Sequence, residues 1–442
     1  MPPPVPCAPG REVRVGTRRA SRLDGFVTAI RGFRLLDPFR VRGFLYQWPA
    51  DLLINWGNEI ELLILGWYIL VETESVLLLT LFGALRFLGT LIAPMFGMAG
   101  DKFGHRNVLC AMRAIYTLLA LTMTVLAFTG VLRPLYVMLL ATLSGLVRPS
   151  DNAMRNALIA AIMPGRQLMG AMGVARTTSD FARIVGPLFG AGMIAAFGMG
   201  PVYVAVTALY AAGLVLTGMG GAGLAHRRAA GVGRSSFARE VLEGLVHVWR
   251  TPCLHAGMWL AFLVNMTAFP ITGSLLPYIA REVYHIDQTG LGLLVASFAV
   301  GGLLGSILIS LFAQTMPTGR MMIVAAAGWY AVLQVFVLMP NPVAGAIMLM
   351  LTGLVQSFSM VPLSVMLLRV AGDRYRGRIM GVRMLAIYGL PVGLLASGAL
   401  IEWFGYLAMA SGYCIFGLAA TLGIALWWRD ALWPLDAPGN TK

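Results

Sequence analysis

The sequence predicts an all-α integral membrane protein with about twelve transmembrane helices. Of its 442 residues, 58% are hydrophobic and 12% are charged, and the mean hydropathy is +0.78. A chain with so few polar residues cannot cover the surface of a soluble globule. Its apolar runs are continuous over roughly 20 residues, as helical spans require, whereas a membrane barrel would show alternating strands of ~10 residues.

The apolar runs fall into two groups of six. They lie near 44–71, 76–97, 108–129, 134–147, 168–197, 201–221, 253–280, 290–314, 320–339, 342–368, 379–402 and 407–428. The tripeptide Met172–Val174 recurs as Met380–Val382 in the equivalent span of the second group, as an internal duplication predicts. We expect a disordered cytoplasmic tail at 1–40, a six-helix bundle at 41–222, a cytoplasmic linker with an amphipathic helix at 223–252, a second six-helix bundle at 253–428, and a cytoplasmic tail at 429–442.

The basic residues orient the chain. The formal net charge is +14, but the arginines are scattered between spans rather than gathered on one soluble face. We therefore expect the lipid bilayer, and not nucleic acid, as the partner. Every second connection is basic, and the intervening ones hold only Arg133 and Arg281. By the positive-inside rule, both termini are expected in the cytoplasm, in a cytoplasmic (inner) membrane of the bacterial type.

A short polar turn joins the second and third spans and reads Gly-x-x-x-Asp-x-x-Gly-x-Arg. Its marked positions are Gly97, Asp101, Gly104 and Arg106. The turn resembles the loop signature of the major facilitator superfamily of transporters. This resemblance implies the major facilitator fold, with two pseudo-symmetric six-helix bundles around a central cavity. It also implies a cytoplasmic latch, in which Asp101 meets the amino end of the eleventh span near Arg376 and Arg378.

Two further motifs narrow the resemblance. The fifth span contains Gly186, Pro187 and Gly190, similar to the Gly-Pro-x-x-Gly motif of superfamily exporters, in which small residues allow close packing and proline bends the helix. Residues 376–381 and 389–393 resemble the junction of the tenth and eleventh spans in the branch of enterobactin exporters and macrolide efflux proteins. The chain departs from proton-coupled drug antiporters in its fourth span, because the nearest arginine, Arg148, is expected at the cytoplasmic end.

Ionisable residues inside the predicted spans indicate paired or functional groups, because each costs at least ~2.5 kcal/mol to bury. Asp51, Asn55 and Glu59 recur every four residues on one face of the first span, while Glu61 points to a neighbouring helix. The second span contains one cation, Arg86. The fifth span carries a stripe of charged residues on one face, and these are Arg176, Asp180 and Arg183.

We expect Glu59 to pair with Arg86, and Asp180 to pair with its flanking arginines. Such a network could serve only to lock the amino-terminal bundle. Alternatively, it binds an anionic substrate, or it takes up and releases a proton as the cavity changes sides. In the carboxy-terminal half the polar residues expected at the depth of the cavity lie among aromatic and methionine side chains, and they are Asn265, Gln356 and Tyr388.

These observations predict a secondary active exporter of a small amphipathic, anionic molecule, siderophore-like or drug-like, that works by alternating access and is driven by the proton gradient. Uptake of a small polar solute and transport of a lysolipid are alternatives. From another class, a non-transporting membrane receptor or assembly scaffold is the rival hypothesis. The sequence has no phosphate-binding loop, nucleophile elbow or metal-spaced His or Cys cluster, so we expect no enzyme, cofactor or metal. We expect a monomer.

Overall fold

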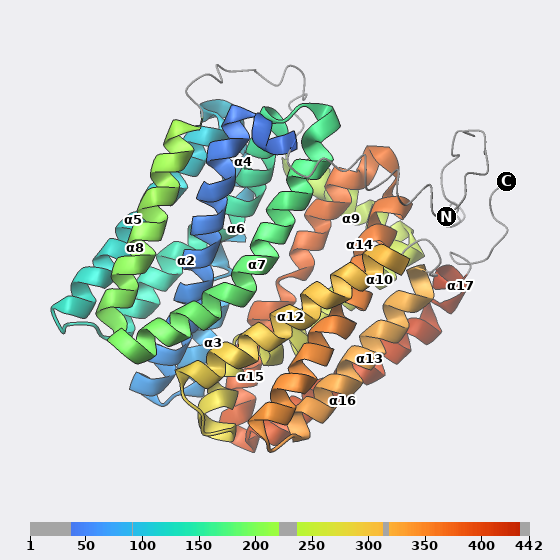
Figure 1. Ribbon diagram of the computed structural model, residues 1–442. Helices are drawn as coiled ribbons and strands as arrows, with labels where there is room; N and C mark the ends of the chain where they lie inside the picture. Colours follow the sequence, from blue (N-terminus) through green and yellow to red (C-terminus); the bar gives the residue numbers. More distant parts are fainter. Residues whose placement is uncertain (1–36, 91, 221–236, 313–317, 434–442) are drawn as a thin grey trace.

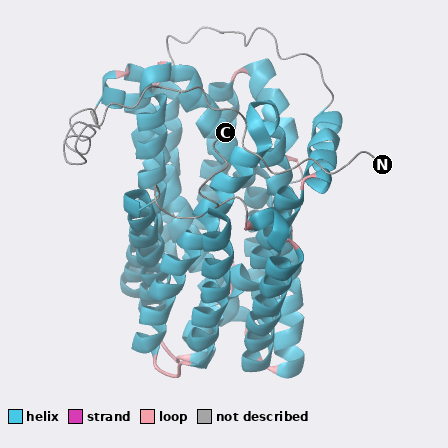
Figure 2. Ribbon diagram, turned by 90° about the vertical axis from the view of Figure 1, so that its right-hand side faces the viewer, coloured by secondary structure: helices cyan, strands magenta, loops and turns pink. Residues whose placement is uncertain are grey.

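The protein is built from long helices that run side by side and are joined by short connections (Figure 2). The computed structural model describes residues 37–90, 92–220, 237–312 and 318–433, with the backbone alone at 37, 94, 101, 165–166, 237–242, 312, 318 and 372–378. Within these ranges the regular structure is entirely helical. Most of the predicted tails and much of the predicted linker lie outside the described residues.

The first half of the chain contributes six membrane helices, the second of which is broken. They follow a short 3₁₀ turn, η1 (Asp37–Arg40), and comprise α2 (Arg42–Thr73), α3 (Val76–Leu85) with η2 (Leu88–Thr90) and α4 (Ala93–Phe103), α5 (His105–Phe128), α6 (Pro134–Ile162), α7 (Gly165–Phe197) and α8 (Met199–Met219).

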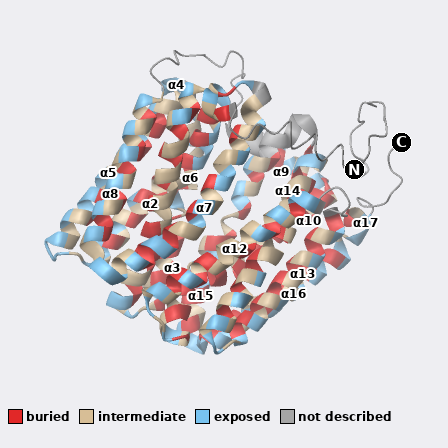
Figure 3. Cartoon of the chain, viewed as in Figure 1, coloured by how far each residue is buried: buried red, intermediate tan, exposed pale blue. Residues whose placement is uncertain are grey.

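The second half begins with the amphipathic helix α9 (Phe237–Arg250), which packs against α10 and α14. The elements after α9 are α10 (Pro252–Thr272) with α11 (Leu276–Tyr278) and η3 (Ile279–Val283), α12 (Gln288–Phe312), α13 (Thr318–Leu338), α14 (Pro342–Ala386), α15 (Gly389–Phe404), α16 (Tyr406–Trp427) and the turn α17 (Arg429–Leu432). Buried residues concentrate between the helices of each half (Figure 3).

Among the described residues, nine segments are long and apolar enough to cross a membrane. Together with α2, α6 and the broken helix α3–η2–α4, they make up the twelve predicted spans, and the all-α membrane fold is confirmed. The helices α2 and α6 are less apolar because they carry the polar stretches 51–61 and 148–155. One helix, α14, contains the span Pro342–Ala371 and the start of the span Ile379–Phe404.

Two sequence-based expectations about local structure were wrong. The fourth span does not end at residue 147, because α6 continues to Ile162 past an internal proline, Pro149. The polar turn predicted at 97–106 is mostly helical, since α4 continues to Phe103 and α5 begins at His105. Only Gly104 separates the two helices, and its φ of +87° is a backbone conformation that glycine adopts without strain.

The two halves contact each other closely at one end of the molecule. We call this the far end, and we call the other end, where α9 lies, the α9 end (Figure 1). At the far end α7 meets α12, where a Cβ built on Gly292 would lie 2.7 Å from the Cβ of Ala191. In addition, Arg281 donates hydrogen bonds to the carbonyl oxygen of Leu70 at 2.6 Å and to Glu74 at 3.2 Å. The far end is therefore closed in this structure.

Candidate functional site

A charged stripe on α7 faces the second half of the protein. Near the far end, Pro187 contacts α12, since its carbonyl oxygen would lie 3.1 Å from a Cβ on Gly292. Arg183, Asp180 and Arg176 precede Pro187 by four, seven and eleven residues, so they share its side of the helix. We call these three residues the α7 face. The side chains of Arg183 and Arg176 are 59% and 71% exposed, so the stripe is accessible where the halves do not meet.

Glu59 of α2 borders the α7 face. Its Oε1 lies 3.9 Å from Nε of Arg183, and Asn55, one turn earlier, donates to Ser179 at 3.2 Å. Arg176 and Asp180 form their own ion pair at 3.2 Å. The structure therefore brings together Asn55 and Glu59 of the first span with Asp180 and Arg183 of the fifth.

The glycines of the Gly-Pro-x-x-Gly motif explain why α2 and α7 approach so closely. A Cβ on Gly186 would lie 2.7 Å from Cβ of Glu59, and a Cβ on Gly190 would lie 3.1 Å from Ile60. Larger side chains at either position would push the helices apart. Pro187 lies inside the continuous helix α7. The motif thus sets the distance between Glu59 and the α7 face.

Arg86 does not pair with Glu59, contrary to the expectation from sequence. Its guanidinium donates to Oδ1 of Asn58 at 3.1 Å and lies 5.7 Å from the ring centroid of Phe82. Successive residues of a helix point about 100° apart. For this reason Asn58 faces the second span while its neighbour Glu59 faces α7.

Asp51 also does not share a face of α2 with Asn55 and Glu59, contrary to the expectation from sequence. It is buried, accepts a hydrogen bond from Gln47 at 2.7 Å, and pairs with the fully buried Arg113 of α5. Arg113 in turn donates to Thr217 of α8. A spacing of eight residues turns the helix by about 80° beyond two full turns, so Asp51 and Glu59 reach different neighbours. Asp51 therefore belongs to an interior network and not to the α7 face.

A second interior network was missed by the sequence analysis. Glu61 of α2 accepts from Arg148 of α6 and from the hydroxyl of Tyr210 of α8, both at 2.9 Å. Arg148 stands fourteen residues from each end of α6 (Pro134–Ile162), so its predicted place at the end of the fourth span was wrong. Further along α6, Arg155 is also buried and pairs with Asp151 at 3.1 Å.

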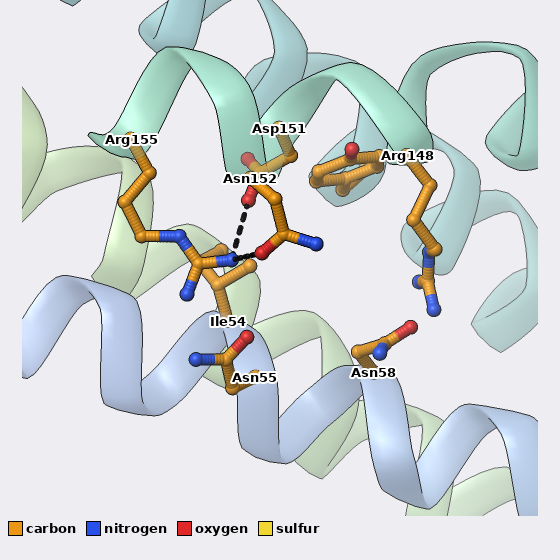
Figure 4. Close-up of a pocket in the computed structure, with 8 residues that line it drawn as sticks. Ile54, Asn55, Asn58, Arg148, Asp151, Asn152 and Arg155 are labelled. Atoms are coloured by element: carbon orange, nitrogen blue, oxygen red, sulfur yellow. Dashed lines mark hydrogen bonds and ion pairs between the residues drawn. The ribbon is translucent and has the colours of Figure 1, made fainter. Parts of the chain in front are cut away.

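A small polar pocket lies between these networks (Figure 4). Its volume is about 40 Å³, enough for a few water molecules or a small ion but not for a drug-sized ligand. In Figure 4 Arg155 donates to Asp151 and Asn152 on one side, and Arg148 extends toward Asn58 on the other. The lining residues are Ile54, Asn55, Asn58, Tyr116, Arg148, Asp151, Asn152 and Arg155.

The polar residues predicted in the second half do not form a charged network. Asn265 donates to the carbonyl oxygen of Ala261 at 2.8 Å within α10. Tyr388, between α14 and α15, has a buried hydroxyl that makes no hydrogen bond in the described chain, and Gln356 is half-buried on α14. The charges at depth are thus concentrated in the first half.

The residues of the predicted latch are only partly described. The side chains of Asp101, Arg376 and Arg378 lie outside the described residues. Arg106 donates to the carbonyl oxygens of Thr217 and Gly218, a favourable position for a cation because helix α8 ends there. Gly97 has open space around it. The latch therefore stays a prediction.

In the part of the chain that the structure describes, no group of three or more His, Cys, Asp or Glu side chains is placed to hold a metal ion. The site instead consists of arginines, carboxylates and amides on α2, α6 and α7. Such groups suit the binding of polar or charged small molecules and the transfer of protons.

The fold is shared with solved transporters of low sequence identity. A bacterial homolog of the human lysosomal transporter Spinster, solved in an inward-facing and unoccupied conformation, is 11% identical with a TM-score of 0.70, over 91% of this chain and 99% of that chain. A D-xylose–proton symporter is 12% identical with a TM-score of 0.67, over 87% and 97%. The nucleoside transporter NupG is 13% identical with a TM-score of 0.65, over 88% and 98%. No curated protein matches the chain.

The fold defines a secondary transporter of the major facilitator type, and the family and the solved structures that match it are transporters rather than enzymes. Residues 34–429 match the transmembrane secretion effector family. Because this match covers most of the chain, the protein belongs to that family, and the resemblance to the major facilitator superfamily is confirmed. The narrower resemblance to enterobactin exporters and macrolide efflux proteins stays a hypothesis.

Proposed function

We propose that the protein exports a small amphipathic anion by alternating access and uses the proton gradient to do so. The observation that carries the proposal is the position of Arg183. It lies on the α7 face toward the second half, it is largely exposed, and it is 3.9 Å from the carboxylate of Glu59. An anion that binds Arg183 would compete with Glu59 for the same cation, so the charge of Glu59 responds to the anion. For export driven by the proton gradient, we propose that the protein changes sides with either the anion or the proton bound, and not with both.

The rest of the site supports an amphipathic anion as substrate. The first half supplies the cations of the α7 face, while the helices of the second half carry mostly apolar and aromatic residues, among them Trp259 of α10, which is 46% exposed. A molecule with a negative group and an apolar body would satisfy both surfaces. The description of the family as a secretion effector supports export, and siderophore-like and drug-like acids are the classes we propose.

The structure fits one of the two states that alternating access requires. With the far end closed, we propose that the α7 face is reached from the α9 end. In the orientation that we propose from the positive-inside rule, with both termini in the cytoplasm of a bacterial-type cell, this state would load substrate from the cytoplasm. We further propose that the two bundles at 41–222 and 253–428 rock against each other as one monomer, with Asp101 acting as the latch.

Everted membrane vesicles test this proposal. Vesicles that contain the protein are offered a siderophore, a macrolide, a lysolipid and a neutral sugar, with an inside-acid pH gradient imposed. We expect accumulation of the anionic amphipathic compound, and its loss when a protonophore collapses the gradient. Accumulation in right-side-out vesicles alone would instead support uptake. Absence of any flux that depends on the protein would favour a receptor or scaffold.

A further inference from the structure

The pocket between α2, α5 and α6 contains buried polar atoms without partners. The hydroxyl of Tyr116, Nη1 of Arg148 and Nε of Arg155 make no hydrogen bond in the described chain, although all three residues line the pocket. Tyr116 and Arg155 are only 2% and 5% exposed. Buried polar atoms are nearly always satisfied, so three around one pocket indicate that a bound group satisfies them.

The amide side chains of the pocket also present donors. Asn58 accepts from Arg86 and Asn152 accepts from Arg155, in each case through the side-chain carbonyl oxygen. Their NH₂ groups are the remaining polar atoms, and these can only donate. Among the fully buried side-chain atoms of the described pocket lining, Oδ1 of Asp151 is an acceptor without a partner, and the other oxygen of Asp151 accepts from Arg155 at 3.1 Å. The pocket is therefore rich in donors and poor in acceptors.

The charges around the pocket do not balance. Three acids pair with three arginines, in the pairs Asp51–Arg113, Glu61–Arg148 and Asp151–Arg155, and Nε of Arg155 also lies 4.0 Å from Oδ1 of Asp51. A fourth arginine, Arg86, is 9% exposed and has Asn58 and the Phe82 ring as neighbours. These four cations and three anions carry a net charge of +1, and Glu59 with Arg183 adds a neutral pair. An unbalanced charge at this depth is costly, and a bound anion would neutralise it.

We propose that this pocket binds a singly charged anionic group, a carboxylate or a halide, held by Arg148, Arg155 and Tyr116 and adjoined by Asn58. A second negative charge would find no further cation and would be repelled by Asp151. The volume of about 40 Å³ admits such a group, and the body of a larger molecule would stay outside the pocket. The inference deepens the proposed function, because the acid group of the exported molecule is one source of the anion. A free inorganic anion is the other.

A pair of tyrosine variants tests the site. Tyr116 and Tyr203 are both buried and both have a hydroxyl without a partner, but only Tyr116 lines the pocket. The full-length protein in detergent is titrated with sodium benzoate and with sodium chloride, and binding is measured by calorimetry and by the shift in Tm. We expect Tyr116→Phe to raise the Kd about tenfold, the effect of losing one hydrogen bond to a charged group, and Tyr203→Phe to change it less than twofold.

A charge variant gives a second test that does not depend on the tyrosines. Asn58→Asp keeps the shape of the side chain and places a carboxylate beside Arg86, which is 3.1 Å from Oδ1 of Asn58. We expect the variant to have a higher Tm without added anion than the natural protein, and to lose the response to benzoate and chloride. A lower Tm together with an unchanged anion response would overturn the proposal.

The two anions, benzoate and chloride, distinguish the two possible sources of the bound group. Binding of benzoate that chloride displaces only weakly assigns the pocket to the acid group of an organic substrate, and binding of chloride alone assigns it to an inorganic ion. Absence of binding by either anion, or equal effects of Tyr116→Phe and Tyr203→Phe, contradicts the site. Because binding is measured without transport, a failure of export in vesicles would overturn the proposed function and leave this result intact.

Discussion

Arg148 of α6 and Glu61 of α2 form an ion pair of 2.9 Å in the interior of the first half, and the hydroxyl of Tyr210 bonds to both of them. Glu61 follows Glu59 by two residues, about 200° around the helix, so the pair lies on the opposite side of α2 from the α7 face. The first half is therefore held together by interior charges, while a separate set of charges faces the second half.

Removing one partner of this interior pair should strongly destabilise the protein. Arg148→Ala leaves Glu61 buried without its cation, and such a change costs about 3–5 kcal/mol. We expect a clear drop of Tm in detergent. The double variant Glu61→Gln, Arg148→Gln should lose less than the sum of its single variants, because neither side chain keeps an unpaired charge. Strictly additive losses would show that the two residues do not interact.

The crossing of α3 and α6 depends on a glycine. A Cβ on Gly145 would lie 2.6 Å from the carbonyl oxygen of Leu85, which is backbone and cannot rotate away. Gly145→Ala should therefore cost about 1–3 kcal/mol through overpacking. Gly192→Ala is the matched control, because Gly192 is also helical and has nothing within 4 Å. A Tm that is equal in the two variants would contradict the described crossing.

The contact of α7 with α12 should control the closed far end. Gly292→Leu would place a side chain where Ala191 and Pro187 now pack, so we expect the far end to open and transport to fall. Spin labels at the exposed positions 135 and 343, one in each half, would report a longer distance. Gly192→Leu, which meets open space, should leave the distance unchanged. A short distance in the Gly292 variant would show that this contact does not close the far end.

The proposed latch predicts a transport defect without a folding defect. Asp101→Asn removes the charge that the family pattern assigns to the latch, and we expect the export rate to fall about tenfold, the effect of ~1.4 kcal/mol. Expression and Tm should stay normal. The control is Lys102→Gln, a neighbouring exposed position. Export at the full rate in the Asp101 variant would show that Asp101 does not act as a latch.

The fold could be predicted from the sequence because each membrane span is marked by a long run of apolar residues. Hydropathy over some twenty residues reports each span, and the ends of α2, α8 and α16 fall within a few residues of the predictions. Boundaries failed where charge was used to end a span. The fourth span was cut at Arg148, although Arg148 pairs with Glu61 of α2, and the charges that follow, Asp151 and Arg155, pair with each other and stay buried inside α6.

The site could be predicted only in part, because pairing depends on which helices are neighbours. Spacing along α7 correctly placed Asp180 beside Arg176. Partners on different helices were harder to predict. The sequence predicted that Arg86 pairs with Glu59, whereas in the structure Arg86 donates a hydrogen bond to Asn58. Arg113 was overlooked, although an arginine within an apolar run is itself a signal of a buried partner. A search of every span for such isolated charges would have found Arg113.

The most direct test of the account is the dependence of export on the pH gradient when Glu59 cannot ionise. Everted vesicles that contain the natural protein or Glu59→Gln are loaded with the exported anion under an imposed gradient, and binding is measured separately on the purified proteins. We predict that Glu59→Gln still binds the anion, since Arg183 is retained, but no longer accumulates it in response to the gradient. Gradient-driven accumulation at the natural rate would contradict the coupling of Glu59 and Arg183 on which the proposed mechanism depends.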